Sequence, residues 1–172
     1  GRHYPDIVST KRRLANRLVL QHYADISTAC CDFSAKALRE IEGFPKAITL
    51  PNGVDLTNLP KRGTQSETNQ LRQKLGMHIG VPYAACIARF HPVKDHETLI
   101  RGWQVVNRAL PRAKLLLVGD GECREACEAL CRELGLKDSI EFWGMRHDVP
   151  EILRAIDAFS LTSVSEAASL TL

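Results

Sequence analysis

Arg89 and Lys94 flank a short polar segment, RFHPVKD, which follows the apolar run YAACIA at residues 83–88. Arginine offers a planar fork of donors that suits phosphate, and lysine adds a compact positive charge. Two cations after a strand of a parallel sheet would suit a diphosphate, because ligands bind outside the carboxyl ends of such strands. An arginine and a lysine in an exposed turn are also common as solvated residues, so both interpretations stay open at this point.

A second polar segment, GDGE, follows the apolar run KLLLV at residues 114–118. It lacks the third glycine of a dinucleotide-binding GxGxxG motif, so a tight turn from strand to helix is favoured. Asp120 and Glu122 are predicted to cap the following helix rather than to form a metal pair.

Glu166 stands in a third segment, SVSEAAS, after the apolar run AFSLT at residues 158–162. A carboxylate in a turn of small residues can accept hydrogen bonds from sugar hydroxyls, and free N–H groups of a following helix can meet an anion. Capping of that helix is an equally good interpretation of Glu166.

The elements around these segments alternate regularly. Strands are predicted at 83–88, 114–118, 139–143 and 158–162, with helices between them at 96–110, up to Gly135, and after Asp148 with Pro150 in the first turn. This order predicts an α/β fold, a Rossmann-like parallel sheet with helices on both faces. The loops RFHPVKD, GDGE, GMRHD and SVSEAAS should therefore open on one edge of the sheet.

The first fifty residues form a separate pattern. It predicts a helix over 11–24, a strand within 25–31, a helix over 32–43 with Asp32 or Ser34 as its cap, and a strand at 47–50. Residues 57–70 are predicted to be a connection, and 71–76 a short helix. We place a boundary near residue 51, which gives domains at 1–51 and 52–172.

Composition excludes several classes of protein. The net charge of +3 suits an anionic ligand but is too mild for nucleic acid. No apolar run approaches the roughly 20 residues of a membrane span, and no leader segment is visible. The six histidines are scattered, and no nucleophile elbow is present.

The cysteines are predicted to pack rather than to bind metal. Cys123, Cys127 and Cys131 recur every fourth residue, which places them on one helical face, and no CxxC pair occurs. Thiols used as core residues favour a reducing, cytoplasmic setting.

Five segments, taken in order, resemble the retaining glycosyltransferases of family 4, which have the GT-B fold of two facing Rossmann-like domains. They are PNGVD, LRQKLG, ARFHPVKDHETLIRGW, LLLVGDGECREACEALCRELGL and IEFWGMRHDVPEILRAIDAFSLTSVSEAASL. The resemblance implies that residues 52–172 are the donor-binding domain, truncated at its C-terminus, and that residues 1–51 are the end of the acceptor-side domain.

The resemblance also implies roles for individual residues. Arg89 and Lys94 would bind the diphosphate of a nucleotide-sugar, and Glu166 would contact the donor sugar. The remaining donor-site residues would be Gly119, Gly121, Met145 (near the base), Ser169 and Leu170. The family's second glutamate would fall two positions past Leu172.

The implied function is transfer of a hexosyl group from a nucleotide-sugar to a sugar, lipid or polysaccharide acceptor, with retention of configuration. No metal or other cofactor is expected if Arg89 and Lys94 stabilise the leaving phosphate. Most of the acceptor side is missing, so the chain alone is expected to bind donor weakly and to be inactive. A GT-B nucleotide-sugar epimerase and a non-catalytic nucleotide-binding or interaction module are the alternatives. The basic segment KRRLANR at 11–17 could contact the inner membrane face peripherally, or it could be an ordinary solvated helix.

Overall fold

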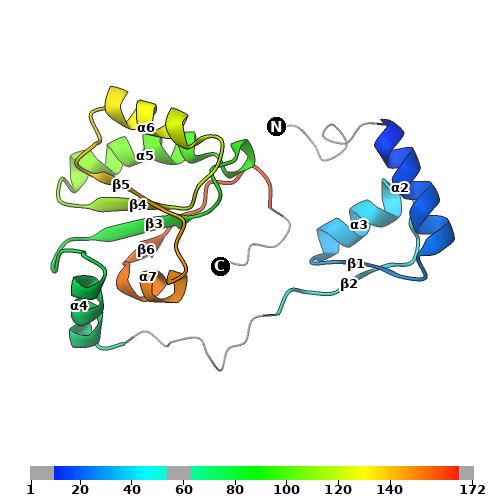
Figure 1. The fold of residues 1–172 in the computed structure, drawn as a ribbon, viewed down its shortest axis with the longest axis horizontal. Coiled ribbons are helices and arrows are strands. Elements are labelled where there is room, and N and C mark those ends of the chain that lie inside the picture. The colour runs from blue at the N-terminus through cyan, green and yellow to red at the C-terminus, as the bar shows by residue number, and fades with distance from the viewer. Residues whose placement is uncertain (1–9, 54–62, 167–172) are drawn as a thin grey trace. The chain divides into compact units, whose positions relative to one another are not determined.

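The computed structural model describes residues 10–53 and 63–166. These residues form two compact units, 10–53 and 63–165 (Figure 1). The domain boundary near residue 51 stays a prediction.

The smaller unit is a parallel β-α-β arrangement preceded by a helix. It contains α2 (Thr10–Tyr23), β1 (Ser27–Ala29), α3 (Asp32–Glu40) and β2 (Ala47–Thr49), and Ser27 of β1 lies opposite Ala47 of β2. The predicted cap of α3 is wrong: the N-cap position is Cys31, which makes no side-chain capping bond. Asp32 lies in the first turn instead, and its carboxylate accepts a hydrogen bond from the Thr49 hydroxyl of β2.

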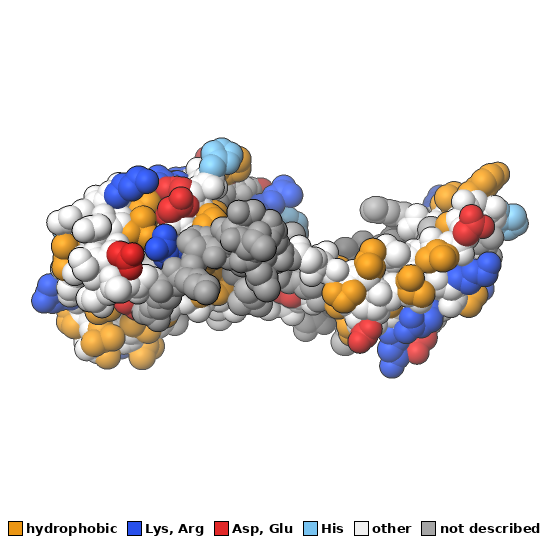
Figure 2. All heavy atoms as spheres, turned by 90° about the horizontal axis from the view of Figure 1, so that it is seen from below, with side chains coloured by type: hydrophobic (Ala, Val, Ile, Leu, Met, Phe, Trp, Pro, Cys, Tyr) orange, Lys and Arg blue, Asp and Glu red, His pale blue; other side chains and the backbone are white. Residues whose placement is uncertain are grey.

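Hydrophobic side chains are exposed on this smaller unit, including Leu14, Leu18 and Val19 of α2. Figure 2 shows hydrophobic and basic side chains interspersed over the unit. This mixture is compatible with the predicted membrane contact of residues 11–17, which stays a prediction.

The larger unit is a four-stranded parallel sheet with the order β5-β4-β3-β6. Its strands are β3 (Tyr83–Ile87), β4 (Lys114–Val118), β5 (Ile140–Gly144) and β6 (Ala158–Phe159). Its helices are α4 (Gln65–Lys74), η1 (Pro92–Lys94), α5 (His96–Ala109), α6 (Arg124–Glu133) and α7 (Val149–Ala155). The predicted α/β fold is confirmed, although β6 is shorter than the predicted strand at 158–162 because only Ala158 and Phe159 pair with β3.

The central strands are buried on both faces, which explains their continuous apolar sequences. Leu115 and Leu117 of β4 pack under α5 and α6, whereas Leu116 and Val118 pack under α7 on the other face. This alternation follows from the two-residue period of a strand. β4 thus holds both helical layers of the sheet in place.

Helix α4 begins at Gln65, inside the segment that we predicted to be a connection, so that prediction is wrong for residues 65–70. The missed signal is a capping box. The Thr64 side chain accepts from the Glu67 N–H, and the Glu67 carboxylate accepts from the Thr64 N–H. Two otherwise unpaired donors are satisfied in this way, which starts a helix in a polar sequence.

Candidate functional site

The chain reverses direction across the sheet at β3, which lies between β4 and β6. β3, β4 and β5 lie side by side in chain order, and the chain then returns to place β6 on the other side of β3. Such a switch point is where ligands bind in open α/β sheets. The segments that follow β3, β4, β5 and β6 all leave the same edge (Figure 1).

The segment after β3 is fixed so that Arg89 points outward. The Ala88 N–H donates to the Val118 carbonyl (3.0 Å), and the Phe90 N–H donates to the Asp120 carbonyl (3.0 Å). Phe90 is fully buried and stacks on His96 with 4.2 Å between ring centroids. Arg89 between them is exposed. Two anchored neighbours therefore present this guanidinium to the edge of the sheet.

Gly119 and Gly121 let the segment after β4 approach the segment after β3. Their φ angles are 136° and 152°, which side chains rarely adopt. A Cβ atom on Gly119 would lie 2.1 Å from the Ala88 carbonyl oxygen, and one on Gly121 would lie 2.4 Å from the Phe90 carbonyl oxygen. The Gly119 N–H also donates to the Gly144 carbonyl at the end of β5 (2.8 Å). The two glycines thus permit the close contact between the segments after β3 and β4, and a backbone hydrogen bond links them to the end of β5.

A pocket of about 470 Å³ opens at this junction. It is lined by Arg89, Gly119, Asp120, Gly121 and Met145. Four of these five residues are ones that the sequence analysis assigned to a donor site. Met145 is 74% exposed, so its side chain offers an apolar wall at the mouth of the pocket.

Asp120 is the lining residue that sequence reasoning placed elsewhere, as a cap of α6. The N-cap of α6 is Cys123, without a side-chain capping bond. The Asp120 carboxylate instead accepts from the Gly121 N–H (2.7 Å) and from Arg124 (3.3 Å). Arg124 offsets part of the negative charge of Asp120, so this carboxylate opposes an anion in the pocket less than an unpaired one would.

Lys94 does not line this pocket, but it lies on the segment that continues from Arg89. It is the last residue of η1, where the His91 ring accepts from the Val93 N–H (3.2 Å). Asp95 follows with φ 48° and ψ 51°, and its carboxylate accepts from the Thr98 N–H to start α5. Lys94 thus stands at a fixed corner between η1 and α5, half-buried.

Glu166 is exposed and stands two residues after Val164. The Val164 N–H donates to the Val93 carbonyl (2.9 Å), which brings the segment after β6 against the segment that carries Lys94. The other two predicted donor-site residues, Ser169 and Leu170, lie outside the described residues.

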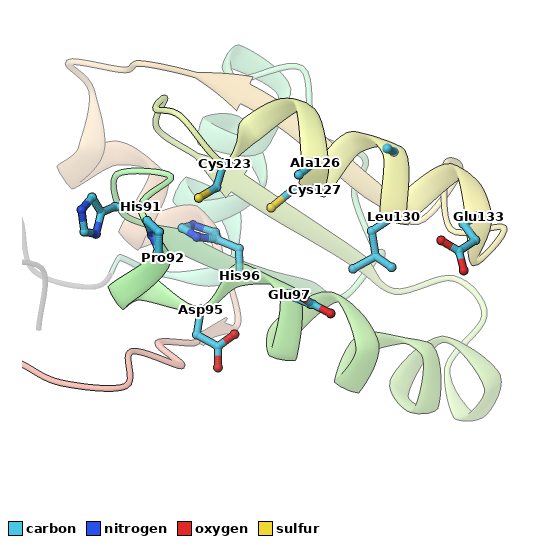
Figure 3. A pocket seen from close by; sticks show the side chains of 11 residues that line it. His91, Pro92, Asp95, His96, Glu97, Cys123, Ala126, Cys127, Leu130 and Glu133 are labelled. Atoms are coloured by element: carbon cyan, nitrogen blue, oxygen red, sulfur yellow. The ribbon is translucent and has the colours of Figure 1, made fainter. Parts of the chain in front are cut away.

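A separate groove of about 530 Å³ lies between α5 and α6. Figure 3 shows His96 from the start of α5, and Cys123 and Cys127 from the α6 side, around this groove. Burial raises the pKa of the Cys127 thiol to about 11, so the thiol stays protonated at neutral pH. Within the part of the chain that the structure describes, no three His, Cys, Asp or Glu side chains gather in a way that could hold a metal ion. Cys127 and Cys131 pack in the core, as predicted.

None of the helices in the described ranges is both long and apolar enough to cross a membrane.

Residues 67–172 match the family of glycosyl transferases group 1. The matched segment is more than half of the chain, and the chain belongs to this family. The sheet, the switch point and the pocket described above all lie within it.

The chain is similar to individual proteins of known type. It is 27% identical over 149 residues to the GDP-mannose-dependent monoacylated alpha-(1-6)-phosphatidylinositol monomannoside mannosyltransferase of Corynebacterium glutamicum. This alignment covers 85% of this chain and 38% of that protein. It is 35% identical over 95 residues to the lipopolysaccharide core biosynthesis glycosyltransferase LpsE of Rhizobium meliloti. This alignment covers 55% of this chain and 27% of that protein.

Among solved structures, HepE of Anabaena in complex with UDP and glucose superposes with a TM-score of 0.82 at 22% identity. The superposition covers 95% of this chain and 44% of HepE. At this identity the likeness shows the fold, which is the α/β fold of the GT-B glycosyltransferases. The chain spans less than half the length of each of these three relatives.

Proposed function

We propose that this chain carries the nucleotide-sugar donor site of a glycosyltransferase. The observation that supports this most is the pocket at the sheet's switch point, because it combines an outward-facing arginine with two glycines that bring the segments after β3 and β4 close together. This pocket lies within residues 67–172, which match the glycosyl transferases group 1 family. None of the relatives described above is named as an epimerase or as a non-catalytic module.

In this proposal Arg89 and Lys94 hold the diphosphate and Glu166 holds the donor sugar. Transfer of the sugar leaves negative charge on the departing diphosphate, and cations fixed in place before the reaction stabilise that charge without reorganising. Arg89 is fixed by the backbone bonds of Ala88 and Phe90, and Lys94 by the corner between η1 and α5. Because Arg89 and Lys94 would supply the positive charge at the diphosphate, we propose that no metal ion takes part.

The glycines and Met145 would shape the nucleotide end of the site. Gly119 and Gly121 allow the segments after β3 and β4 to pack closely, which forms the backbone wall of the pocket, and the exposed Met145 side chain would cover a base. Ser169 and Leu170 are proposed to continue the site beyond the described residues.

The finer features of the activity follow the resemblance to family 4. We propose transfer of a hexosyl group with retention of configuration, by attack on the same face that the leaving group departs, with no protein nucleophile. The acceptor is proposed to be a sugar, lipid or polysaccharide, and the setting cytoplasmic, with possible peripheral contact at the inner membrane face. UDP and GDP are both retained as candidate donor nucleotides, since the matched proteins are named with UDP in one case and GDP-mannose in another.

Calorimetric titration of UDP and of GDP onto this chain tests the proposal. We expect one of the two to bind, and Arg89→Ala to weaken that binding about tenfold to hundredfold, since a hydrogen bond to a charged group contributes about 1.5–3 kcal/mol. Arg101→Ala is the matched control, because Arg101 is an exposed arginine of α5 paired with Glu97 and lies outside the pocket. Binding of neither nucleotide at millimolar concentration, or equal binding by wild type and Arg89→Ala, contradicts the proposal.

A further inference from the structure

The segments after β3 and β6 are joined by hydrogen bonds that the sequence gives no hint of. The Thr162 hydroxyl lies 2.9 Å from the Asp95 carbonyl oxygen and 3.3 Å from the Lys94 carbonyl oxygen. Two residues further on, the Val164 N–H donates to the Val93 carbonyl (2.9 Å). Three consecutive carbonyls, at residues 93–95, therefore face a segment that is almost seventy positions away in sequence.

The backbone at this contact is in an unfavourable conformation. Asp95 is the one non-glycine residue with positive φ among the described residues. A left-handed conformation costs a non-glycine residue free energy, and it persists only where the surroundings fix it. The Asp95 carboxylate accepts from the Thr98 N–H, the Asp95 N–H donates to the Pro92 carbonyl, and the Asp95 carbonyl faces the Thr162 hydroxyl.

Lys94 lies between two anchored neighbours. On one side η1 is closed by the His91 ring, and on the other side His96 is 2% exposed and stacks on Phe90 at an interplanar angle of 10°. The direction in which the Lys94 side chain leaves the backbone then depends on the two peptide groups that flank its Cα, which carry the Val93 and Lys94 carbonyls. The Lys94 carbonyl faces the Thr162 hydroxyl, and the Val93 carbonyl accepts from the Val164 N–H.

We propose that Thr162 is a positioning residue for Lys94. Its hydroxyl holds the peptide groups of Lys94 and Asp95, and so presents the Lys94 ammonium to the diphosphate of a nucleotide at the switch point. This role rests on the proposed function of Lys94 in donor binding. It is distinct from that function because Thr162 need not touch the ligand.

A double-mutant cycle in nucleotide affinity tests the role. Thr162→Val keeps the shape of the side chain and removes the hydroxyl. Thr162 also lines an apolar groove of about 570 Å³, together with Thr98 of α5 and Phe159 of β6. We expect Thr162→Val to weaken binding of the diphosphate that the wild type binds, UDP or GDP, about threefold to tenfold, as expected for loss of one hydrogen bond. Thr162→Ser, which keeps the hydroxyl, should restore the affinity.

The decisive arm combines Thr162→Val with Lys94→Ala. If Thr162 acts through Lys94, Thr162→Val has no further effect on affinity in the Lys94→Ala background, because coupled sites are not additive. Thr98→Val is the matched control, since it removes another hydroxyl from the lining of the same apolar groove and should leave affinity unchanged.

The outcomes separate this inference from the proposed function. Equal losses from Thr162→Val in both backgrounds, or failure of Thr162→Ser to restore affinity, overturn the positioning role while nucleotide binding by the wild type stands. No binding of UDP or GDP by the wild type overturns the proposed function and, with it, the role of Thr162.

Discussion

At Gly119 and Gly121, a single added methyl group would disturb the backbone that forms the pocket. We expect Gly119→Ala and Gly121→Ala each to destabilise the protein by about 3 kcal/mol, through a clash with a carbonyl oxygen and a disfavoured φ. Urea denaturation of each variant measures this loss.

Gly102 provides the control for that pair. It lies within α5, and a Cβ there would meet no atom within 4 Å. Gly102→Ala should therefore stabilise the protein by about 0.5–1 kcal/mol, because glycine is unfavourable inside a helix. Similar stabilities for all three variants would contradict the tight contact between the segments after β3 and β4.

At the scale of single residues, most of the residues that line the pocket could be predicted from the sequence, but their hydrogen bonds could not. Arg89, Gly119, Gly121 and Met145 come together because they follow three strands of one parallel sheet, β3, β4 and β5. The succession of these strands along the chain can be predicted from the alternating pattern. The contacts of Asp120 with Arg124 and of Thr162 with Asp95 could not be predicted. The Asp120–Arg124 contact depends on the turn that leads into α6, and the Thr162–Asp95 contact depends on how the segments after β3 and β6 pack against each other.

Arg72 of α4 links three elements of the larger unit. Its buried guanidinium donates to the Ala155 carbonyl (2.7 Å), to the Val81 carbonyl (3.2 Å) and to the Asp157 carboxylate (2.8 Å). Asp157 also accepts from the Tyr83 N–H at the start of β3 (2.8 Å). This network fixes α4 and the end of α7 against the sheet.

We expect Arg72→Met to destabilise the larger unit by about 3 kcal/mol, because the buried Ala155 carbonyl and the part-buried bonds to Val81 and Asp157 all lose their donor. Lys74→Met, at the last residue of the same helix, should change stability by less than about 0.5 kcal/mol, as is usual for surface substitutions. Thermal and urea unfolding of both variants compare them. A loss for Arg72→Met no larger than that for Lys74→Met would show that the network does not hold α4 in place.

Element prediction succeeded where a hydrophobic pattern was present and failed where local polar bonds decide the structure. β3 and β4 were predicted within one residue of their bounds because they are apolar runs. The first six residues of α4 were missed because the sequence there is polar, and the capping box of Thr64 and Glu67 is the feature that starts the helix. Asp148 takes the predicted N-cap position of α7, but its carboxylate binds Arg146 (2.8 Å from Nε) rather than the helix.

At the scale of the molecule, the buried thiols couple the stability of the fold to alkaline pH. Burial raises the pKa of Cys86, Cys127 and Cys131 from about 9 to about 11. A thiol whose pKa is higher in the folded state contributes stability that is complete below pH 9 and is lost as the pH rises toward 11.

We therefore expect the free energy of unfolding to fall between pH 8.5 and about pH 10.5, and to fall less in a Cys127→Ala/Cys131→Ala variant. Urea denaturation across this interval measures both slopes, and the variant's lower overall stability does not affect the comparison. Equal slopes would mean that the two thiols are not buried as the structure places them.

The general arrangement of the larger unit could be predicted from its sequence, since right-handed crossovers leave few ways to order four parallel strands. The four elements of the smaller unit were predicted too, although β1 and β2 have only three residues each; their parallel pairing was not predicted.

The proposed function requires a nucleoside diphosphate to bind at the edge of the sheet where the segments after β3, β4 and β5 meet. Titration of UDP and GDP onto ¹⁵N-labelled chain, followed by two-dimensional NMR, tests it directly. We predict that one nucleotide shifts the amide signals of Arg89, Gly119, Gly121 and Met145, and leaves those of Ala126 and Leu130 in the α5–α6 groove unchanged. Shifts centred on the α5–α6 groove, or no shift at the four pocket amides with either nucleotide at millimolar concentration, would contradict the account.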